Sequence, residues 1–238
     1  MLNKITASLI CMDLSDIKAD IDTLLNNGIN HLHADFMDNT FVPRLGISPE
    51  LIQWIKKRYS DNVSIDSHLM VQDPISCLDV IAPYSDWVFF HYEAVTDPVR
   101  VLQVMNKYEV NKGVTYNLGS HFHSYLQDTG LVDGIMFMGI SPGVLGTKSW
   151  PDIVTKKIYQ TRTRVSDNKV LIFVDGGVNF KSIKDLTSPK KNFAWNVDGA
   201  DFVVCGGSTL FKIDDETELM DRDEMIKYNI KRISEALK

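Results

Sequence analysis

Two pairs of polar residues stand two positions apart at the ends of apolar runs: His33 with Asp35, and Asp66 with His68. Alternate residues of a strand point to the same face, so each pair would direct an imidazole and a carboxylate to one side of a sheet. Both groups are costly to bury unless they are paired or ligated. At the ends of apolar strands they therefore indicate an active site rather than a core.

A further carboxylate, Asp175, closes a later apolar run. Each residue alone is more simply a hydrogen-bonded core or loop group, but His33, Asp35, His68 and Asp175 all fall at predicted strand ends. Two imidazoles and two carboxylates form a mixed donor set suited to one divalent ion of Zn, Mn, Fe or Co, with room for substrate oxygens. By strand alternation Asp66 shares a face with His68 but lies one layer deeper, so we predict a supporting hydrogen-bonding role for it.

Glycine-rich segments follow the last three predicted strands, at residues 141–146, 175–177 and 205–208. Glycine lets backbone N–H groups approach an anion closely, and the loops after the last strands of a barrel often bind phosphate beside a helix N-terminus. An ordinary turn is the simpler interpretation of any one glycine pair. Three such segments at one rim favour a phosphate site.

Three methionines, Met37, Met70 and Met138, follow or close strands that carry candidate site residues. Methionine is often a core filler, and that interpretation stays open for each of them. Together they would form an apolar lining that limits the access of water to a reactive intermediate.

The elements that position these residues alternate between two kinds of segment. Eight short apolar or β-branched runs are predicted strands: Ile5–Ile10, Asn30–Asp35, Val63–His68, Trp87–His91, Lys112–Tyr116, Gly134–Met138, Val170–Asp175 and Asp201–Cys205. Amphipathic segments between and after them are predicted helices: Ile17–Asn26, Pro49–Tyr59, Pro74–Ile81, Pro98–Tyr108, Ile153–Val165 and Asp223–Leu237.

The runs recur about every 28 residues, close to the roughly 30 residues of a βα unit. Eight such units predict an α/β fold of the (β/α)8 TIM-barrel type, with the active site at the carboxyl ends of the strands. An open doubly wound sheet would share the alternation. Its first turn should carry a glycine-rich fingerprint, and residues 11–14 contain no glycine.

Composition sets further bounds. The chain has 238 residues, of which 44% are hydrophobic, and this favours a single domain over residues 1–238. A net charge of -6 argues against a nucleic-acid partner, and no apolar run approaches the roughly 20 residues of a membrane span. Three scattered cysteines form no CxxC pair and indicate a reducing compartment, so we expect a cytoplasmic protein.

Read together, these motifs resemble the ribulose-phosphate 3-epimerase family from Ser8 to about Phe211. The family's His-x-Asp-x-Met-Asp stretch stands at residues 33–38 and its Phe-Val-Pro at 41–43. Its His-Leu-Met-Val is found at 68–71, its Asp-Gly-Gly-Val-Asn at 175–179, and its Pro-Gly loop begins at residue 142.

The resemblance implies an isomerase that inverts C3 of a ketose phosphate, converting D-ribulose 5-phosphate to D-xylulose 5-phosphate with one divalent metal ion. His33, Asp35, His68 and Asp175 would be the metal ligands. Asp35 and Asp175 would also be the catalytic acid and base on opposite faces of the substrate, which is a ketose phosphate. Members of the family are commonly homo-oligomers, so we expect a dimer or a higher multiple.

The resemblance also implies a set of substrate-binding residues: Ser8, His68, Gly143, Val144, Leu145, Gly146, Gly176, Gly177, Gly206, Gly207 and Ser208. Residues 8–14 and the Gly-x-Ser order at 206–208 resemble the D-allulose-6-phosphate 3-epimerase branch most. That branch would make the substrate a six-carbon ketose phosphate, converted to fructose 6-phosphate.

The chain departs from the family pattern near the phosphate. Arg44 stands where Asn usually follows Phe-Val-Pro, and Leu145 and Thr147 replace the usual Gly or Ala and Gln. These changes leave two alternatives open. One is a catalytically impaired barrel that binds a sugar phosphate as a sensor or interaction protein. The other is a related decarboxylase, which would need a lysine at a strand end, and none is well placed here.

Overall fold

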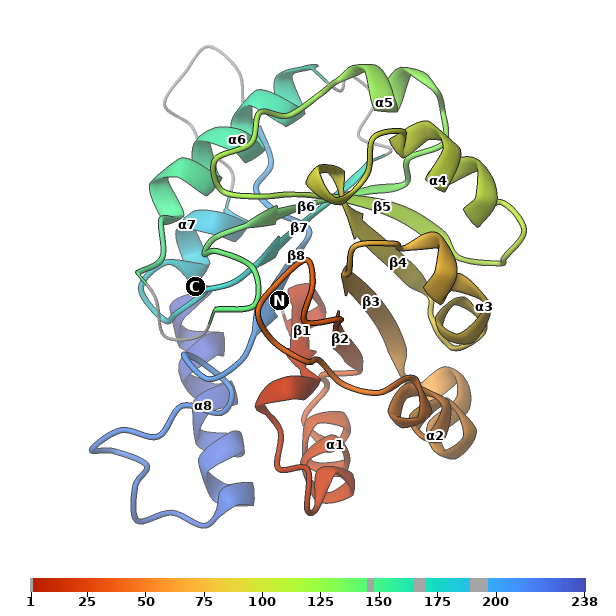
Figure 1. Cartoon of the computed structure of the whole chain (residues 1–238). Helices are drawn as coiled ribbons and strands as arrows, with labels where there is room; N and C mark the ends of the chain where they lie inside the picture. Colours follow the sequence, from red (N-terminus) through yellow and green to blue (C-terminus); the bar gives the residue numbers. More distant parts are fainter. Residues whose placement is uncertain (1, 145–147, 165–169, 189–196) are drawn as a thin grey trace.

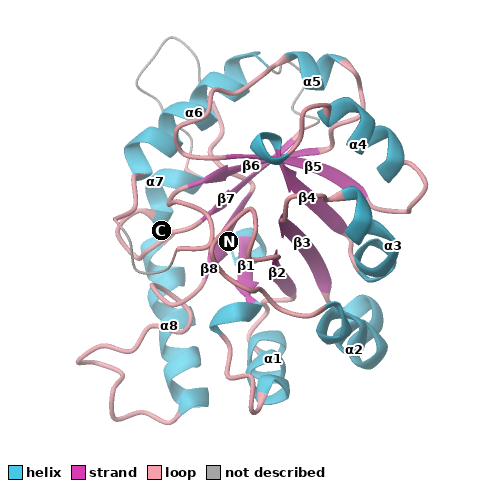
Figure 2. Cartoon of the chain, in the orientation of Figure 1, coloured by secondary structure: helices cyan, strands magenta, loops and turns pink. Residues whose placement is uncertain are grey.

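Eight parallel strands close into a barrel in chain order, from β1 to β8, and β8 pairs with β1. This computed structural model describes residues 2–144, 148–164, 170–188 and 197–238. Helices lie around the outside of the barrel (Figures 1 and 2). The predicted (β/α)8 barrel is therefore confirmed.

The strands are β1 (Ile5–Ser8), β2 (His31–Met37), β3 (Ser64–Met70), β4 (Trp87–His91), β5 (Asn111–Tyr116), β6 (Gly134–Met138), β7 (Leu171–Asp175) and β8 (Phe202–Cys205). The α-helices are α1 (Ile17–Asn26), α2 (Pro49–Tyr59), α3 (Leu78–Ile81), α4 (Pro98–Met105), α5 (Tyr125–Asp128), α6 (Pro151–Arg164), α7 (Ile183–Thr187) and α8 (Arg222–Ala236). None of the helices in the described ranges is long and apolar enough to cross a membrane.

Local chemistry explains where the regular helices begin. Asp16, Asp97 and Asp221 are the N-caps of α1, α4 and α8, and each side chain accepts a hydrogen bond from a backbone N–H of the first turn. Such a cap stabilises a helix by about 1 kcal/mol. Proline opens α2 and α4, where its fixed φ suits the first turn.

Three helices differ from the prediction. The predicted helix over residues 74–81 is a 3-10 turn at Ile75–Cys77 followed by the short α3. The short helices α5 and α7 were not predicted, because four or five residues carry no complete amphipathic repeat.

The lower part of the barrel interior is a packed apolar plug. Trp87, Phe89, Met136 and Phe173 form a buried cluster there. A Cβ atom on Gly113 would lie 2.0 Å from the Phe89 ring, so the glycine makes room for that side chain. A second and larger core lies between the strands and the helices. One buried polar side chain, that of His31 at the start of β2, packs edge-on against Phe173 and Phe202 at this level.

The register of the strands places the two polar pairs side by side. His33 is opposite Asp66, and Asp35 is opposite His68, in the parallel pairing of β2 with β3. Asp175 ends β7. Asp35, His68 and Asp175 thus lie in the carboxyl halves of their strands, on the side where barrel enzymes build their active sites, and His33 and Asp66 lie one layer deeper.

Candidate active site

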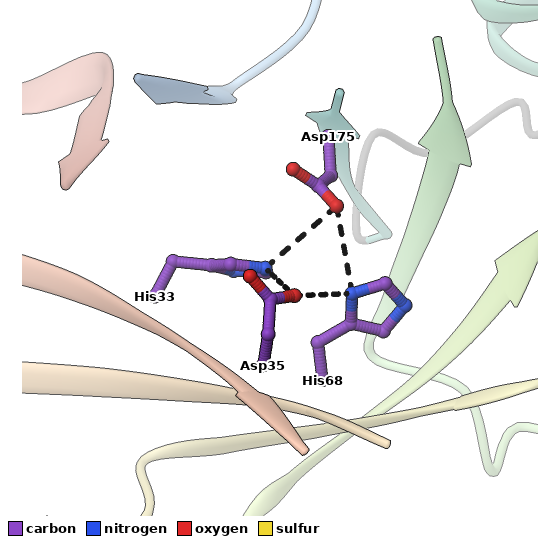
Figure 3. A group of neighbouring side chains, drawn as sticks. All are labelled: His33, Asp35, His68 and Asp175. Atoms are coloured by element: carbon purple, nitrogen blue, oxygen red, sulfur yellow. Dashed lines mark hydrogen bonds and ion pairs between the residues drawn. The ribbon is translucent and has the colours of Figure 1, made fainter. Parts of the chain in front are cut away.

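Four side chains from three strands converge at the carboxyl end of the barrel (Figure 3). His33, Asp35, His68 and Asp175 each offer one ligand atom, and these four atoms lie within 4.8 Å of one another. Asp35 Oδ1 lies 3.1 Å from His33 Nε2 and 3.2 Å from His68 Nδ1. The structure thus brings together the four residues that the sequence singled out.

Asp175 completes the cluster from the other side of the barrel. Its Oδ2 atom lies 3.8 Å from His33 Nε2 and 3.5 Å from His68 Nδ1. Both imidazoles are fully buried, whereas the two carboxylates keep a small exposed fraction. The carboxylates are therefore the members of the cluster that reach the pocket above it.

Asp66 lies beneath the cluster and contacts His33. Its Oδ1 accepts a hydrogen bond from His33 Nδ1, and its Oδ2 lies 3.1 Å from His31 Nε2. Asp66 is fully buried, which confirms the prediction of a deeper, supporting position. With Nδ1 engaged, His33 presents Nε2 to the cluster.

His68 has a different set of partners. Its Nε2 lies 2.9 Å from His91 Nε2, and His91 Nδ1 lies 3.3 Å from Glu93 Oε2. Glu93 Oε1 accepts a hydrogen bond of 2.8 Å from the backbone N–H of Asn117. His91 and Glu93 were not predicted from the sequence. Their signal was available, because His91 ends β4 and Glu93 follows it with the two-residue spacing of His33 and Asp35.

Burial and charge act in opposite directions on these groups. Burial alone would lower the pKa of His33, but the carboxylates of Asp66 and Asp35 outweigh it and raise that pKa well above its ordinary value. The pKa of His68 is raised for the same reason by Asp175 and Asp35. Burial raises the pKa of Asp66 less than His33 and His31 lower it, which leaves it at about 2.

The pKa values of Asp35 and His91 also follow from their surroundings. The pKa of Asp35 lies well below its ordinary value, since the two imidazoles outweigh the effect of burial. Burial lowers the pKa of His91 to about 4 despite the nearby Glu93 carboxylate. In this buried network the carboxylates thus favour the protonated form of His33 and His68, whereas burial favours the neutral form of His91.

A cavity of about 130 Å³ opens above the cluster. Asp35, Asp175 and the three methionines Met37, Met70 and Met138 line it. Its rim is formed by eight of the residues predicted to bind substrate: Ser8, Gly143, Val144, Gly176, Gly177, Gly206, Gly207 and Ser208. His68, also predicted to contact substrate, lies fully buried below the lining. Leu145 and Gly146 lie outside the described residues.

Two glycines of the rim have a backbone that few other residues adopt. Gly176 and Gly177 have φ angles of 91° and 70°. A Cβ atom on Gly177 would lie 2.3 Å from Ser149 Cβ, and one on Gly176 would lie 2.5 Å from Ile140 Cγ1. The loop after β7 therefore needs glycine both for its conformation and for its close packing.

The lining also contains residues that were not predicted to bind substrate, among them Arg44 and Cys11. Arg44 is the one basic side chain among the described residues that line the cavity. A guanidinium group favours phosphate or carboxylate partners. Cys11 has a raised pKa because it is buried, so its thiol is protonated at neutral pH.

Fold and site together define a class: (β/α)8 barrels with a candidate mononuclear metal site beneath a glycine-rich rim. Comparison with known proteins identifies the family. The model described as the ribulose-phosphate 3 epimerase family matches residues 4–211, and the chain belongs to this family. The predicted resemblance and the prediction of an isomerase are thereby confirmed.

Two curated relatives cover nearly the whole chain. A ribulose-phosphate 3-epimerase of Helicobacter pylori is 30% identical over 218 residues, which cover 89% of this chain and 92% of the relative. A ribulose-phosphate 3-epimerase of Escherichia coli is 28% identical over 231 residues, which cover 94% and 96%.

Solved structures of lower identity share the fold alone. A tryptophan synthase structure from Mycobacterium tuberculosis has a TM-score of 0.61 at 13% identity, and the match covers 99% of this chain and 93% of that one. KGPDC from Streptococcus mutans has a TM-score of 0.55 at 13% identity, covering 97% and 98%.

Proposed function

We propose that this protein epimerises a ketose phosphate at C3, with D-ribulose 5-phosphate and D-xylulose 5-phosphate as the substrate pair. The observation that carries the proposal is the convergence of Asp35 and Asp175 with two buried imidazoles under a glycine-rich pocket. The relatives that are named ribulose-phosphate 3-epimerase support the choice of substrate.

The cluster fits one divalent metal ion. His33 Nε2, Asp35 Oδ1, His68 Nδ1 and Asp175 Oδ2 would hold it, and the outer nitrogen of each imidazole already has a partner. This mixed donor set suits Zn, Mn, Fe or Co. Bound there, the cation would supply positive charge that stabilises the negative charge developing on the substrate oxygens.

Asp35 and Asp175 are the proposed proton-transfer groups. They reach the cavity from β2 and β7, and both line it. One carboxylate removes the C3 proton from one face of the sugar, and the other delivers a proton to the opposite face. Two groups are required because a single base would tend to return the proton to the face from which it came.

The methionines protect this proton transfer from water. Met70 and Met138 are only 3% and 2% exposed, and both line the cavity beside the carboxylates. Their thioether side chains present apolar surface to the sugar carbons. We propose that they, with Met37, keep solvent from the carbanionic intermediate.

The phosphate of the substrate would lie at the glycine-rich rim. Backbone N–H groups of the loops after β6, β7 and β8 can approach an anion closely there, and Ser8 and Ser208 add hydroxyl groups. Val144 also lines this part of the cavity. Arg44 would contribute the positive charge that backbone groups lack.

A kinetic comparison tests the proposal. The metal content of the purified protein is measured first, and turnover of D-ribulose 5-phosphate and D-allulose 6-phosphate is then compared in the same preparation. We expect a higher kcat/KM for the five-carbon substrate. A higher value for the six-carbon substrate would assign the protein to the allulose branch that residues 8–14 and 206–208 resemble. Binding of both without turnover would identify a sensor instead.

We propose that residues 1–238 form one domain in a homodimer or a larger homo-oligomer. Trp150 and Tyr125 are 42% and 46% exposed, and such aromatic side chains suit a subunit contact. Sedimentation velocity at micromolar concentration tests this proposal, and a monomer would refute it. A cytoplasmic location is supported by Cys11, Cys77 and Cys205, which are all free thiols.

A further inference from the structure

We propose that His91 and Glu93 form a positioning relay that fixes the tautomer of His68 and directs its Nδ1 lone pair into the donor cluster. The inference rests on the proposed metal centre and goes beyond it, because neither residue is a candidate ligand. Glu93, His91 and His68 form one continuous chain of contacts, with distances of 3.3 Å and 2.9 Å between the joined atoms.

With a metal ion on His68 Nδ1, the donors and acceptors along this chain would be compatible in one arrangement only, because the one proton of the neutral His68 ring would then lie on Nε2. A carboxylate is purely an acceptor, so Glu93 Oε2 accepts a hydrogen bond from the N–H of His91 Nδ1. A neutral imidazole then has an unprotonated Nε2, which accepts the N–H of His68 Nε2. In the metal-bound state His68 would thus keep its proton on Nε2 and present an unprotonated Nδ1 to the ion. That is the form in which an imidazole binds a metal ion.

The surroundings hold the relay in place. His91 and His68 are fully buried, and their ring planes are inclined by only 24°. Phe41 packs on His91 with ring centroids 4.8 Å apart. At the far end, the backbone N–H of Asn117 donates to Glu93 Oε1 and fixes the carboxylate. Contacts with Phe41 and with the backbone of Asn117 therefore fix the positions of His91 and Glu93 independently of His68.

The two imidazoles of the cluster are supported differently. His33 bonds a carboxylate directly, whereas a second imidazole stands between His68 and its carboxylate. In the sequence, His91 ends β4 and Glu93 follows two residues later, which is the spacing of His33 and Asp35 within β2. His33 and Asp35 would bind the metal ion, whereas His91 and Glu93 would position one of its ligands.

Zinc affinity of the whole chain tests the relay. The dissociation constant is measured by competition with a chelator for the wild type, His91→Leu, His91→Gln and Glu93→Gln. Leucine removes the hydrogen-bond acceptor of His68, whereas glutamine retains a carbonyl oxygen that can accept a hydrogen bond from the N–H of His68 Nε2. His123→Leu is the matched control, since His123 stacks on Tyr92 at 4.5 Å and does not line the cavity.

We expect His91→Leu to weaken zinc binding about 10- to 100-fold. His91→Gln should restore most of that loss, Glu93→Gln should weaken binding less than His91→Leu, and His123→Leu should change nothing. Unfolding temperatures of the metal-free proteins are measured alongside, because a purely structural role would lower them without a change in zinc affinity. The visible ligand-field bands of bound Co²⁺ should shift in His91→Leu and recover in His91→Gln.

A second measurement needs no substitution. Two-bond ¹⁵N–¹H correlation spectra of the zinc-loaded wild type should show the proton of His91 on Nδ1 and that of His68 on Nε2. A proton on His91 Nε2, or wild-type zinc affinity in His91→Leu, would overturn the relay. A wild type that binds no zinc would refute the proposed metal centre and the relay with it. A wild type that binds zinc but epimerises nothing refutes only the proposed activity, and the affinities still decide the relay.

Discussion

Individual residues in the cluster are distinguished by what lies behind them. His33 and His68 are closed off from the cavity and have partners on their outer nitrogens, whereas Asp35 and Asp175 line the cavity. A group that exchanges protons with a substrate has to reach it. The difference in burial therefore distinguishes the side chains that can only bind the metal ion from those that can also transfer a proton. The imidazoles are suited to ligation and the carboxylates to ligation with proton transfer.

Asp175→Asn tests this division at the residue scale. The amide cannot accept the C3 proton or return one, so we expect kcat to fall at least about 1,000-fold. Turnover of D-ribulose 5-phosphate at saturating metal measures the effect. Asp61→Asn, an exposed carboxylate outside the cluster, is the control and should retain wild-type turnover. Substantial activity in Asp175→Asn would remove it from the mechanism.

Metal affinity should rise with pH. The surrounding carboxylates raise the pKa of His33 well above its ordinary value and also raise that of His68, so both imidazoles retain a proton to higher pH than a free imidazole does. A cation must displace those protons, and each one displaced adds about a tenfold gain in affinity per pH unit below the folded pKa. Calorimetry in two buffers of different protonation enthalpy counts the protons released. An affinity that is flat between about pH 6 and 8 would contradict the raised pKa values.

Among the elements, the loops at the carboxyl rim depend on exact backbone shape. Gly177 has φ at 70° and leaves no space for a Cβ atom beside Ser149. Gly130 has a nearly equal φ of 68°, yet a Cβ there would meet nothing within 4 Å. Alanine substitutions at these two glycines therefore distinguish the effect of backbone strain from that of close packing in the loop after β7.

Gly177→Ala should destabilise the protein by about 2 kcal/mol or more, because strain and a steric clash combine. It should also raise KM for the ketose phosphate, since the displaced loop lines the cavity. Gly130→Ala should cost about 1 kcal/mol of stability through strain alone and leave KM unchanged. Denaturant unfolding and steady-state kinetics measure the two effects. An equal KM in both variants would exclude the loop after β7 from substrate binding.

Arg44 belongs to the loop between β2 and α2 and supplies a cation to the cavity. Arg44→Gln keeps a polar side chain but removes the charge. We expect KM to rise about tenfold, the loss of one charge-assisted hydrogen bond, with little change in kcat. The dependence of KM on ionic strength should also weaken. An unchanged KM would place the phosphate away from Arg44.

The sequence predicts the elements of this barrel better than its loops. All eight strands were identified, because each contains a short apolar or β-branched run. His33, Asp35, His68 and Asp175 could be assigned to one site since every strand of a barrel ends at the same rim. The His91 and Glu93 pair was missed, because a histidine that ends an apolar run and has no known motif reads as an ordinary core residue. Which loop residues approach Arg44 depends on the backbone conformation of the loops. The local sequence contains little information about that conformation.

Over the whole molecule, the barrel separates packing from chemistry. An apolar plug of aromatic side chains fills its lower part, and the polar layers lie above it toward the carboxyl rim. The burial of Asp66, His68 and His91 follows from this arrangement, because no solvent reaches them from below. Their polar groups must find hydrogen-bond partners within the protein, so the fold determines which of these groups donates and which accepts.

The central claim is that two carboxylates exchange the C3 proton of a ketose phosphate with solvent. The most direct measurement follows deuterium at C3 by NMR when the metal-loaded protein converts D-ribulose 5-phosphate in D₂O. We predict that the xylulose 5-phosphate formed carries solvent-derived deuterium at C3, and that Asp175→Asn forms none. Absence of C3 exchange with both the five-carbon substrate and D-allulose 6-phosphate would contradict the account.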